Sequence, residues 1–185
     1  MKRKNTVLNP WITLIIALLT MSGIITGVLS ARESQGALVI EGLNLFSCDF
    51  FATFKSSIIS KLLFVLFFIA GGISVFLIPI SAAALFFKNY SYGYTAGLMV
   101  AEMGKKGAML CFSGLLLHNF LFSFFSMLYL SFAVNKSLEC FLNRRNYDYK
   151  VRKNKSFAIV TAIYFVMTIF VSLIEASLSS FLYEI

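Results

Sequence analysis

Charged residues are scarce in this sequence. They make up 13% of its 185 residues, whereas 59% are apolar and 16% are aromatic. Soluble domains carry about 25% charged and roughly 45–50% apolar residues. This scarcity excludes an ordinary water-soluble domain, and we expect lipid to be the solvent for most of the chain.

Acidic residues are fewer than basic ones, with 8 Asp and Glu against 16 Lys and Arg, which leaves a formal net charge of +8. Such an excess can indicate a nucleic-acid partner. Here the basic residues lie in short gaps between hydrophobic runs, where membrane topology and contact with anionic lipid headgroups explain them better. We therefore expect a membrane protein that binds no nucleic acid.

Histidine and cysteine, the side chains that most often bind metals or act in catalysis, are also few. The chain has one histidine, His118, and three cysteines, Cys48, Cys111 and Cys140. No C-x-x-C spacing is present in the sequence, and no second His or Cys shares the expected depth of His118. A nucleotide-binding loop and a nucleophile–base pair are absent from it too. We expect no metal site, no cofactor and no enzymatic activity.

Long apolar runs dominate what is present. A helical membrane span needs about 20 mostly apolar residues. The runs predict an all-α fold, a polytopic transmembrane helical bundle that forms one integral membrane domain over residues 1–185. The expected spans, about five, are 11–29, 62–80, 82–103, 107–134 and 157–182. Hydropathy does not decide the third of these, because it contains Lys88 and several other polar residues.

A basic loop orients the chain. Seven of the 16 basic residues lie in the predicted cytoplasmic loop 135–156, and three more occupy residues 2–4. Loops rich in Lys and Arg stay on the cytoplasmic side during insertion. Both segments share that side only if an even number of spans separates them, so 82–103 must cross. We predict a multi-pass protein of the bacterial cell membrane with a cytoplasmic N-terminus. The residues expected to anchor this topology are Arg144, Arg145, Lys150, Arg152, Lys153 and Lys155.

The predicted outer loop, residues 30–61, is amphipathic. Phe46, Phe50, Phe51 and Phe54 recur at i, i+4, i+5 and i+8, which is typical of a helix lying at the membrane surface. Two interpretations stay open. The loop either connects and shields the tops of the other helices or offers a surface on which a partner docks.

Small residues recur every fourth position in the third predicted span, at Gly93, Gly97 and Ala101. A helix face without side chains lets another helix approach closely. The ladder either packs within the bundle or forms the seam of a homodimer.

The fourth and fifth predicted spans each contain an ionisable residue, His118 and Glu175. At about 1.5 Å per residue, His118 should lie roughly 16 Å and Glu175 roughly 10 Å below the outer surface, which permits a hydrogen bond or ion pair. Intramembrane ionisable groups usually face the bundle interior and have a partner. Asn119 follows His118, and Glu102 lies near the outer end of the third span. These four residues form a predicted polar cluster that either locks helices together or belongs to a proton or ion pathway.

One stretch carries a family resemblance. Residues 77–119 read LIPISAAALFFKNYSYGYTAGLMVAEMGKKGAMLCFSGLLLHN. Their order of a proline turn, a Phe-Lys hinge, a Gly-x-x-x-Gly helix, a Gly-Lys turn and a His-Asn centre resembles the stage II sporulation protein M family, as does LIEASLS around Glu175. The chain departs from the family pattern in three ways: Asn89 replaces the hinge glycine, Leu117 replaces the proline before His118, and the acidic residue that some branches carry shortly after that His is absent.

The resemblance implies a structural role. Members of that family sit in the membrane around the developing forespore and organise two peptidoglycan-degrading partners, a lytic transglycosylase-like protein and an amidase/endopeptidase, during engulfment. By this resemblance the chain would be a scaffold of the septal membrane in a sporulating bacterium. The alternative hypothesis is the membrane subunit of a transporter that works with an ATP-binding cassette partner, with His118 and Glu175 lining a pathway.

Cysteine-accessibility mapping tests the predicted topology. In a cysteine-free background, cysteines introduced at Ser34 and Lys105 should react with an impermeant reagent added to intact spheroplasts, and one at Asn146 should not, because the basic loop stays inside. Cleavage at Arg144–Arg145 by protease added outside would contradict the orientation.

Overall fold

The chain is helical throughout the part that the structure describes. The computed structural model describes residues 9–33, 50–112, 117–142 and 147–183. It contains five long helices and one short 3-10 helix, and no strand occurs in these ranges, so the all-α class is confirmed. The elements are α1 (Pro10–Glu33), α3 (Phe50–Ile73), η1 (Val75–Leu77), α4 (Ile78–Leu110), α5 (Leu117–Leu142) and α6 (Tyr147–Tyr183).

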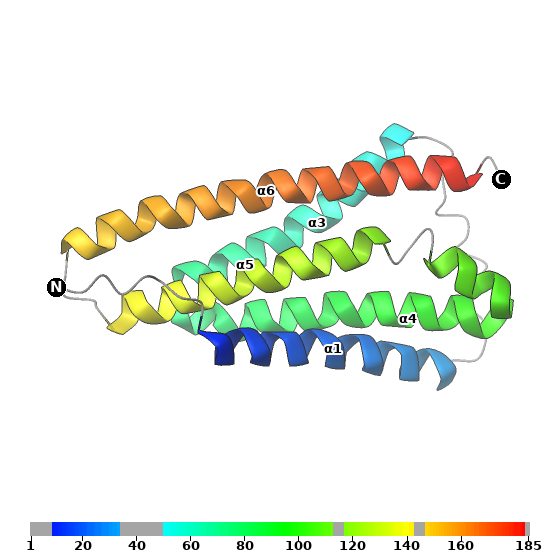
Figure 1. The fold of residues 1–185 in the computed structure, drawn as a ribbon, viewed down its shortest axis with the longest axis horizontal. Helices are drawn as coiled ribbons and strands as arrows, with labels where there is room; N and C mark the ends of the chain where they lie inside the picture. The colour runs from blue at the N-terminus through cyan, green and yellow to red at the C-terminus, as the bar shows by residue number, and fades with distance from the viewer. Residues whose placement is uncertain (1–8, 34–49, 113–116, 143–146, 184–185) are drawn as a thin grey trace.

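The helices form an elongated bundle in which successive rods alternate in direction (Figure 1). The start of α1, the α3–α4 turn and the start of α6 lie at one end, which we call the basic end. The end of α1, the start of α3 and the end of α6 lie at the other end, which we call the opposite end. α1 packs mainly on α4, while α3, α5 and α6 pack on one another.

Four helices are long and apolar enough to cross a membrane. They define a multi-pass membrane protein. The segments are Pro10–Arg32, Phe50–Ile73, His118–Leu142 and Lys155–Leu178. α4 is not among them, because Lys88, Asn89 and the charged residues near its end lower its hydropathy. It nevertheless runs alongside α1 through the length of the bundle (Figure 1).

The second predicted span, 62–80, has wrong bounds. The structure places one continuous helix over Phe50–Ile73, followed by a break. Ser74 is extended, with φ −134° and ψ 134°, and Pro79 falls in the first turn of α4, where its missing N–H leaves no hydrogen bond unmade. Residues 50–61, which were assigned to an outer loop, therefore belong to a candidate span.

Other predicted bounds also shift. α5 begins at Leu117 rather than near residue 107, and α6 extends beyond 157–182 at both ends. Most of the predicted basic loop 135–156 is helical, because α5 continues to Leu142 and α6 starts at Tyr147. The predicted bounds of this loop were wrong, because charged residues lower the hydropathy of a segment but do not break a helix.

The third predicted span ends at a sharp bend. Gly104 has φ 54° and ψ −127°, a backbone conformation that residues with a Cβ rarely adopt. Beyond the bend, the chain turns back on α4, since a Cβ on Gly107 would collide with the Met99 carbonyl. Gly104 thus marks the point at which α4 stops following the bundle axis.

The α1–α4 interface is made by glycines from both helices. A Cβ on Gly23 would lie 2.8 Å from the Phe86 carbonyl oxygen, and one on Gly27 would collide with the backbone of Tyr90. From the other side, Gly93 abuts the Ile24 carbonyl. Backbones that approach this closely gain van der Waals contact along the whole crossing, which drives helix association in lipid.

The buried stripe of α4 differs from the predicted ladder. It consists of residues four apart, namely Ser81, Leu85, Asn89, Gly93 and Gly97. Ala101, by contrast, is exposed. The ladder prediction was wrong at Ala101 because the helix bends soon after it, at Gly104, and α1 has already passed its last contact near Gly97.

Substitution at the glycine interface tests this packing. Gly93→Ala should lower the free energy of unfolding by about 1–3 kcal/mol, because the new Cβ forces the backbones of α1 and α4 apart. Reversible unfolding in mixed detergent micelles measures the change. Ala101→Leu, on the same helix but exposed, serves as the control and should stay within about 0.5 kcal/mol. Equal losses in both variants would contradict the interface.

Candidate functional site

A charged cluster lies inside the bundle, toward its opposite end, and joins three helices. Its centre is Glu175 on α6, which forms an ion pair with Lys61 of α3 and accepts a hydrogen bond from Ser57 of the same helix. His118 of α5 approaches the other carboxylate oxygen, with 3.5 Å between its Nε2 and Glu175 Oε1. We call Ser57, Lys61, His118 and Glu175 the ion-pair cluster.

The α3 half of the cluster follows from helix geometry. Ser57 and Lys61 are four residues apart, so both side chains point to one face of α3. Lys61 Nζ donates a hydrogen bond of 2.7 Å to Ser57 Oγ as well as contacting Glu175. Lys61 is only 2% exposed, although it carries a full charge. The carboxylate therefore bonds both α3 groups from the neighbouring helix.

His118 enters the cluster with one ring nitrogen and leaves the other unused. Its Nδ1 is buried without a hydrogen-bond partner. The Nε2–Oε1 distance of 3.5 Å is at the upper limit for a hydrogen bond, so the contact becomes strong only when the imidazole is protonated. Asn119, next in sequence, is buried as well.

A second lysine lies beside the cluster. Lys88 of α4 points its ammonium at three aromatic rings from three helices, at 4.8 Å from the centroid of Phe64, 4.7 Å from Tyr92 and 5.9 Å from Phe122. The negative faces of aromatic rings attract a cation in such a cage. Nothing in the sequence indicated this cage, because its rings come from helices that are far apart in the chain.

The cage and the cluster share an environment. Lys61 Nζ lies 5.9 Å from the Phe122 ring, so both lysines contact the same aromatic side chain. The Tyr92 hydroxyl is buried with no hydrogen-bond partner. His118 Nδ1 and Tyr92 Oη are thus free to bind a water molecule or a ligand.

The structure places some of the predicted site residues inside the bundle and others on its surface. His118, Asn119 and Glu175 lie inside the bundle, but Glu102 is exposed and takes no part in the cluster. Its prediction was wrong because α4 turns Glu102 toward the outside just before the Gly104 bend. Lys61, rather than Glu102, completes the cluster around Glu175. The pairing of Lys61 was missed because residues 30–61 were predicted to form an outer loop.

The predicted docking and anchoring residues lie mostly on the surface or outside the described part. Phe51 is 77% exposed, while the Phe50 and Phe54 rings stack with centroids 6.3 Å apart. Phe46, Arg144 and Arg145 lie outside the described residues, as do the side chains of Lys150, Arg152 and Lys153. Lys155 is exposed near the start of the α6 candidate span.

Further polar pairs extend from the cluster toward the basic end. Ser123 of α5 donates a hydrogen bond of 2.6 Å to Asn89 Oδ1 of α4, and the Ser126 and Tyr164 hydroxyls lie 2.8 Å apart. Tyr129 stacks on Tyr164 with centroids 4.3 Å apart. Within the described ranges, no group of three or more His, Cys, Asp or Glu residues is arranged to hold a metal ion.

These features define the class: a multi-pass, all-helical membrane protein in which many polar side chains are buried and many large apolar side chains are exposed on the surface. Comparisons with protein families, with curated proteins and with solved structures find no match for the chain. The resemblance to the stage II sporulation protein M family therefore stays a prediction that rests on the quoted residues.

A double-mutant cycle tests the ion-pair cluster. Glu175→Gln should destabilise the bundle by about 3–5 kcal/mol, because it leaves the Lys61 charge buried and unpaired. Lys61→Met should destabilise it less, because Glu175 is partly exposed and keeps its contacts with Ser57 and His118. The double variant should lose less than the sum of the two single losses. Unfolding in mixed micelles measures all three, and strictly additive losses would contradict a direct pair.

Proposed function

We propose that this protein is a non-enzymatic membrane scaffold that anchors or recruits peptidoglycan hydrolases during septal wall remodelling and forespore engulfment. The observation that supports it best is the ion-pair cluster, which ties α3, α5 and α6 together by contacts that use both carboxylate oxygens of Glu175. A bundle locked in this way holds its outer faces in constant positions, as a docking platform requires.

The proposed topology has five spans, with α4 as the fifth and the N-terminus in the cytoplasm. The alternating direction of the five rods supports it, because the start of α1 and the α5–α6 junction then share one side (Figure 1). The resemblance of residues 77–119 supports the sporulation role. The partners would be a lytic transglycosylase-like protein and an amidase/endopeptidase, and the location the septal membrane of a sporulating bacterium.

The proposed docking surface is the start of α3. Phe51 projects from it, 77% exposed, beside the stacked Phe50 and Phe54 rings. Exposed aromatic side chains bury a large area at low entropic cost when a partner covers them. This surface lies at the opposite end of the bundle, which faces the cell wall in the proposed topology.

A specific observation favours the second candidate, a transporter subunit working with an ATP-binding cassette partner. Lys88 has only aromatic rings as its recorded contacts, and the unpartnered His118 Nδ1 and Tyr92 Oη lie in the same part of the bundle. A transport pathway needs groups that can change partners, whereas a static lock does not.

Capture of the two hydrolases distinguishes these functions. The tagged chain, produced in an endospore-forming bacterium, should retain both hydrolases through purification, and Phe51→Ser should reduce their recovery about tenfold or more because it removes a central aromatic contact. Phe112→Ser is the matched control, since Phe112 is 74% exposed but lies beyond the Gly104 bend. His118→Ala should leave recovery unchanged, because Ser57 and Lys61 still hold Glu175 and keep α3 on α6.

Two results would contradict the scaffold. One is failure of the unaltered chain to retain either hydrolase. The other is solute flux in proteoliposomes that Glu175→Gln abolishes while the variant remains folded, which would identify the cluster as part of a transport pathway.

A further inference from the structure

Unpartnered polar atoms gather near the basic end of the bundle, away from the ion-pair cluster. Within the described residues, five buried side-chain atoms have no hydrogen-bond partner, and three of them belong to one stretch of α5. These three are Ser131 Oγ, Lys136 Nζ and Ser137 Oγ. Buried polar groups in proteins are nearly always satisfied, so such a concentration indicates that something polar binds nearby.

Lys136 is the most costly of the three to leave unpaired. The residue is 5% exposed, and its ammonium lies 5.9 Å from the Phe132 ring centroid and 5.7 Å from that of Phe157. The two rings stack on each other, with centroids 6.5 Å apart. Ring faces stabilise a cation only partly, and an unpaired buried charge remains strongly unfavourable. The missing interaction is one with an anion.

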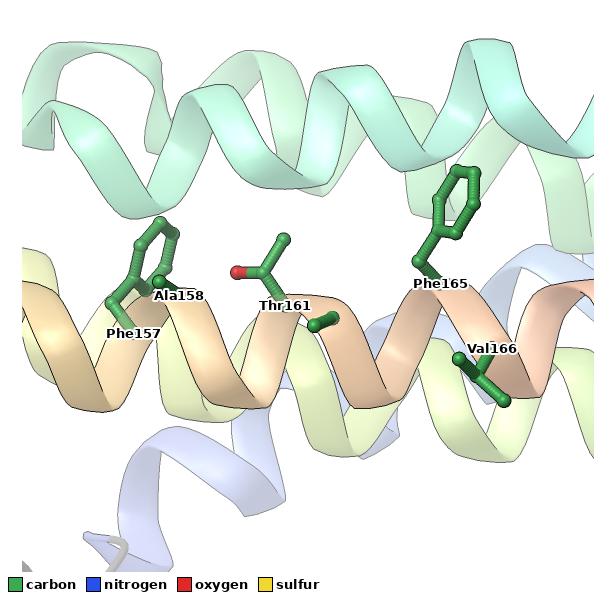
Figure 2. Close-up of a pocket in the computed structure, with 6 residues that line it drawn as sticks. Phe157, Ala158, Thr161, Phe165 and Val166 are labelled. Atoms are coloured by element: carbon green, nitrogen blue, oxygen red, sulfur yellow. The ribbon is translucent and has the colours of Figure 1, made fainter.

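An apolar groove starts at the same phenylalanine. It runs along α6 with a volume of about 580 Å³, and Phe157, Thr161 and Phe165 rise from α6 on the side that faces α3 (Figure 2). Ala158 and Ala162 are exposed, so their short side chains leave the groove open to the surroundings. The lining residues are Phe157, Ala158, Thr161, Ala162, Phe165 and Val166.

The groove and the lysine fit the two halves of one molecule. From Phe157 to Val166 the helix rises by roughly 14 Å, along the direction that a lipid chain takes in the bilayer. Lys136 lies at the end of the groove that is nearer the basic end of the bundle. A lipid headgroup would lie at that end of the groove. Lys155, two residues before Phe157, is exposed and is not among the residues that line the groove.

We propose that this site binds an anionic glycerophospholipid, with one acyl chain in the α6 groove and the phosphate paired with Lys136. The flexible stem of a lysine lets its ammonium move outward past the Phe157 ring to meet a headgroup. A neutral lipid would fill the groove but leave the ammonium unpaired, and a free phosphate would pair with the ammonium but leave the groove open. This inference does not depend on the proposed scaffold function.

Native mass spectrometry of the full chain with phosphatidylglycerol and phosphatidylcholine at equal concentration tests the site. The unaltered protein should carry phosphatidylglycerol in preference to phosphatidylcholine by about fivefold, the contribution of one lysine near an anionic headgroup. Lys136→Gln should abolish the preference, and Lys136→Arg should retain it. Lys155→Gln, which removes an exposed charge from the same end, is the matched control and should keep most of the preference.

If Lys136→Gln does not fold, a substitution in the groove still tests the proposed lipid site. Ala162→Phe fills the groove from an exposed position, so it should reduce phosphatidylglycerol binding without lowering the unfolding temperature. Equal binding of the two lipids to the unaltered protein would overturn the proposal. So would equal losses in Lys136→Gln and Lys155→Gln, unchanged binding in Ala162→Phe, or full displacement of the lipid by inorganic phosphate.

Discussion

The ion pair between Lys61 and Glu175 is the constraint on which the packing of α3, α5 and α6 depends. The Lys61 amine is buried and the Glu175 carboxylate is partly buried inside the bundle, so each depends on the other as a partner. Ser57 and His118 occupy the remaining positions around the carboxylate. The pair therefore sets the rotation and the height of α3 and α6 relative to each other.

The other half of the bundle is held by a different means. α1 and α4 associate through backbone contact at Gly23, Gly27 and Gly93, where no polar side chain is needed. Asn89 of α4 then connects this pair to α5 through Ser123. Apolar side chains such as Leu66, with 67% exposure, are left for the lipid. The interior thus combines an apolar core, which includes Val65, Phe68 and Leu130, with buried polar side chains, while many large apolar side chains are exposed on the outside.

The two candidate functions make opposite demands on the same cluster. A scaffold requires the Glu175 contacts to persist, while a transporter requires Lys61 or His118 to exchange partners during each cycle. Lys88 and its aromatic cage lie next to these groups without a carboxylate of their own. The Lys136 region is physically separate, because it lies farther along α5 toward the basic end and meets the lipid-facing surface of α6.

Much of the architecture could be predicted from apolar runs, because a helix in lipid needs a long stretch without charge. Predictions failed where charge was taken as the end of a span. Lys61 was assigned to a loop because hydropathy cannot register a partner on another helix. The pair of glycines in α1, Gly23 and Gly27, carried a readable four-residue spacing that the prediction did not use.

The sequence by itself thus determined the solvent of the chain and its helical, multi-pass character, since these depend on composition and local periodicity. Only the tertiary structure decided which charges are paired, which glycines meet and where the groove lies. Ser57 and Glu175 are 118 residues apart, and their contact exists only when α3 and α6 lie side by side.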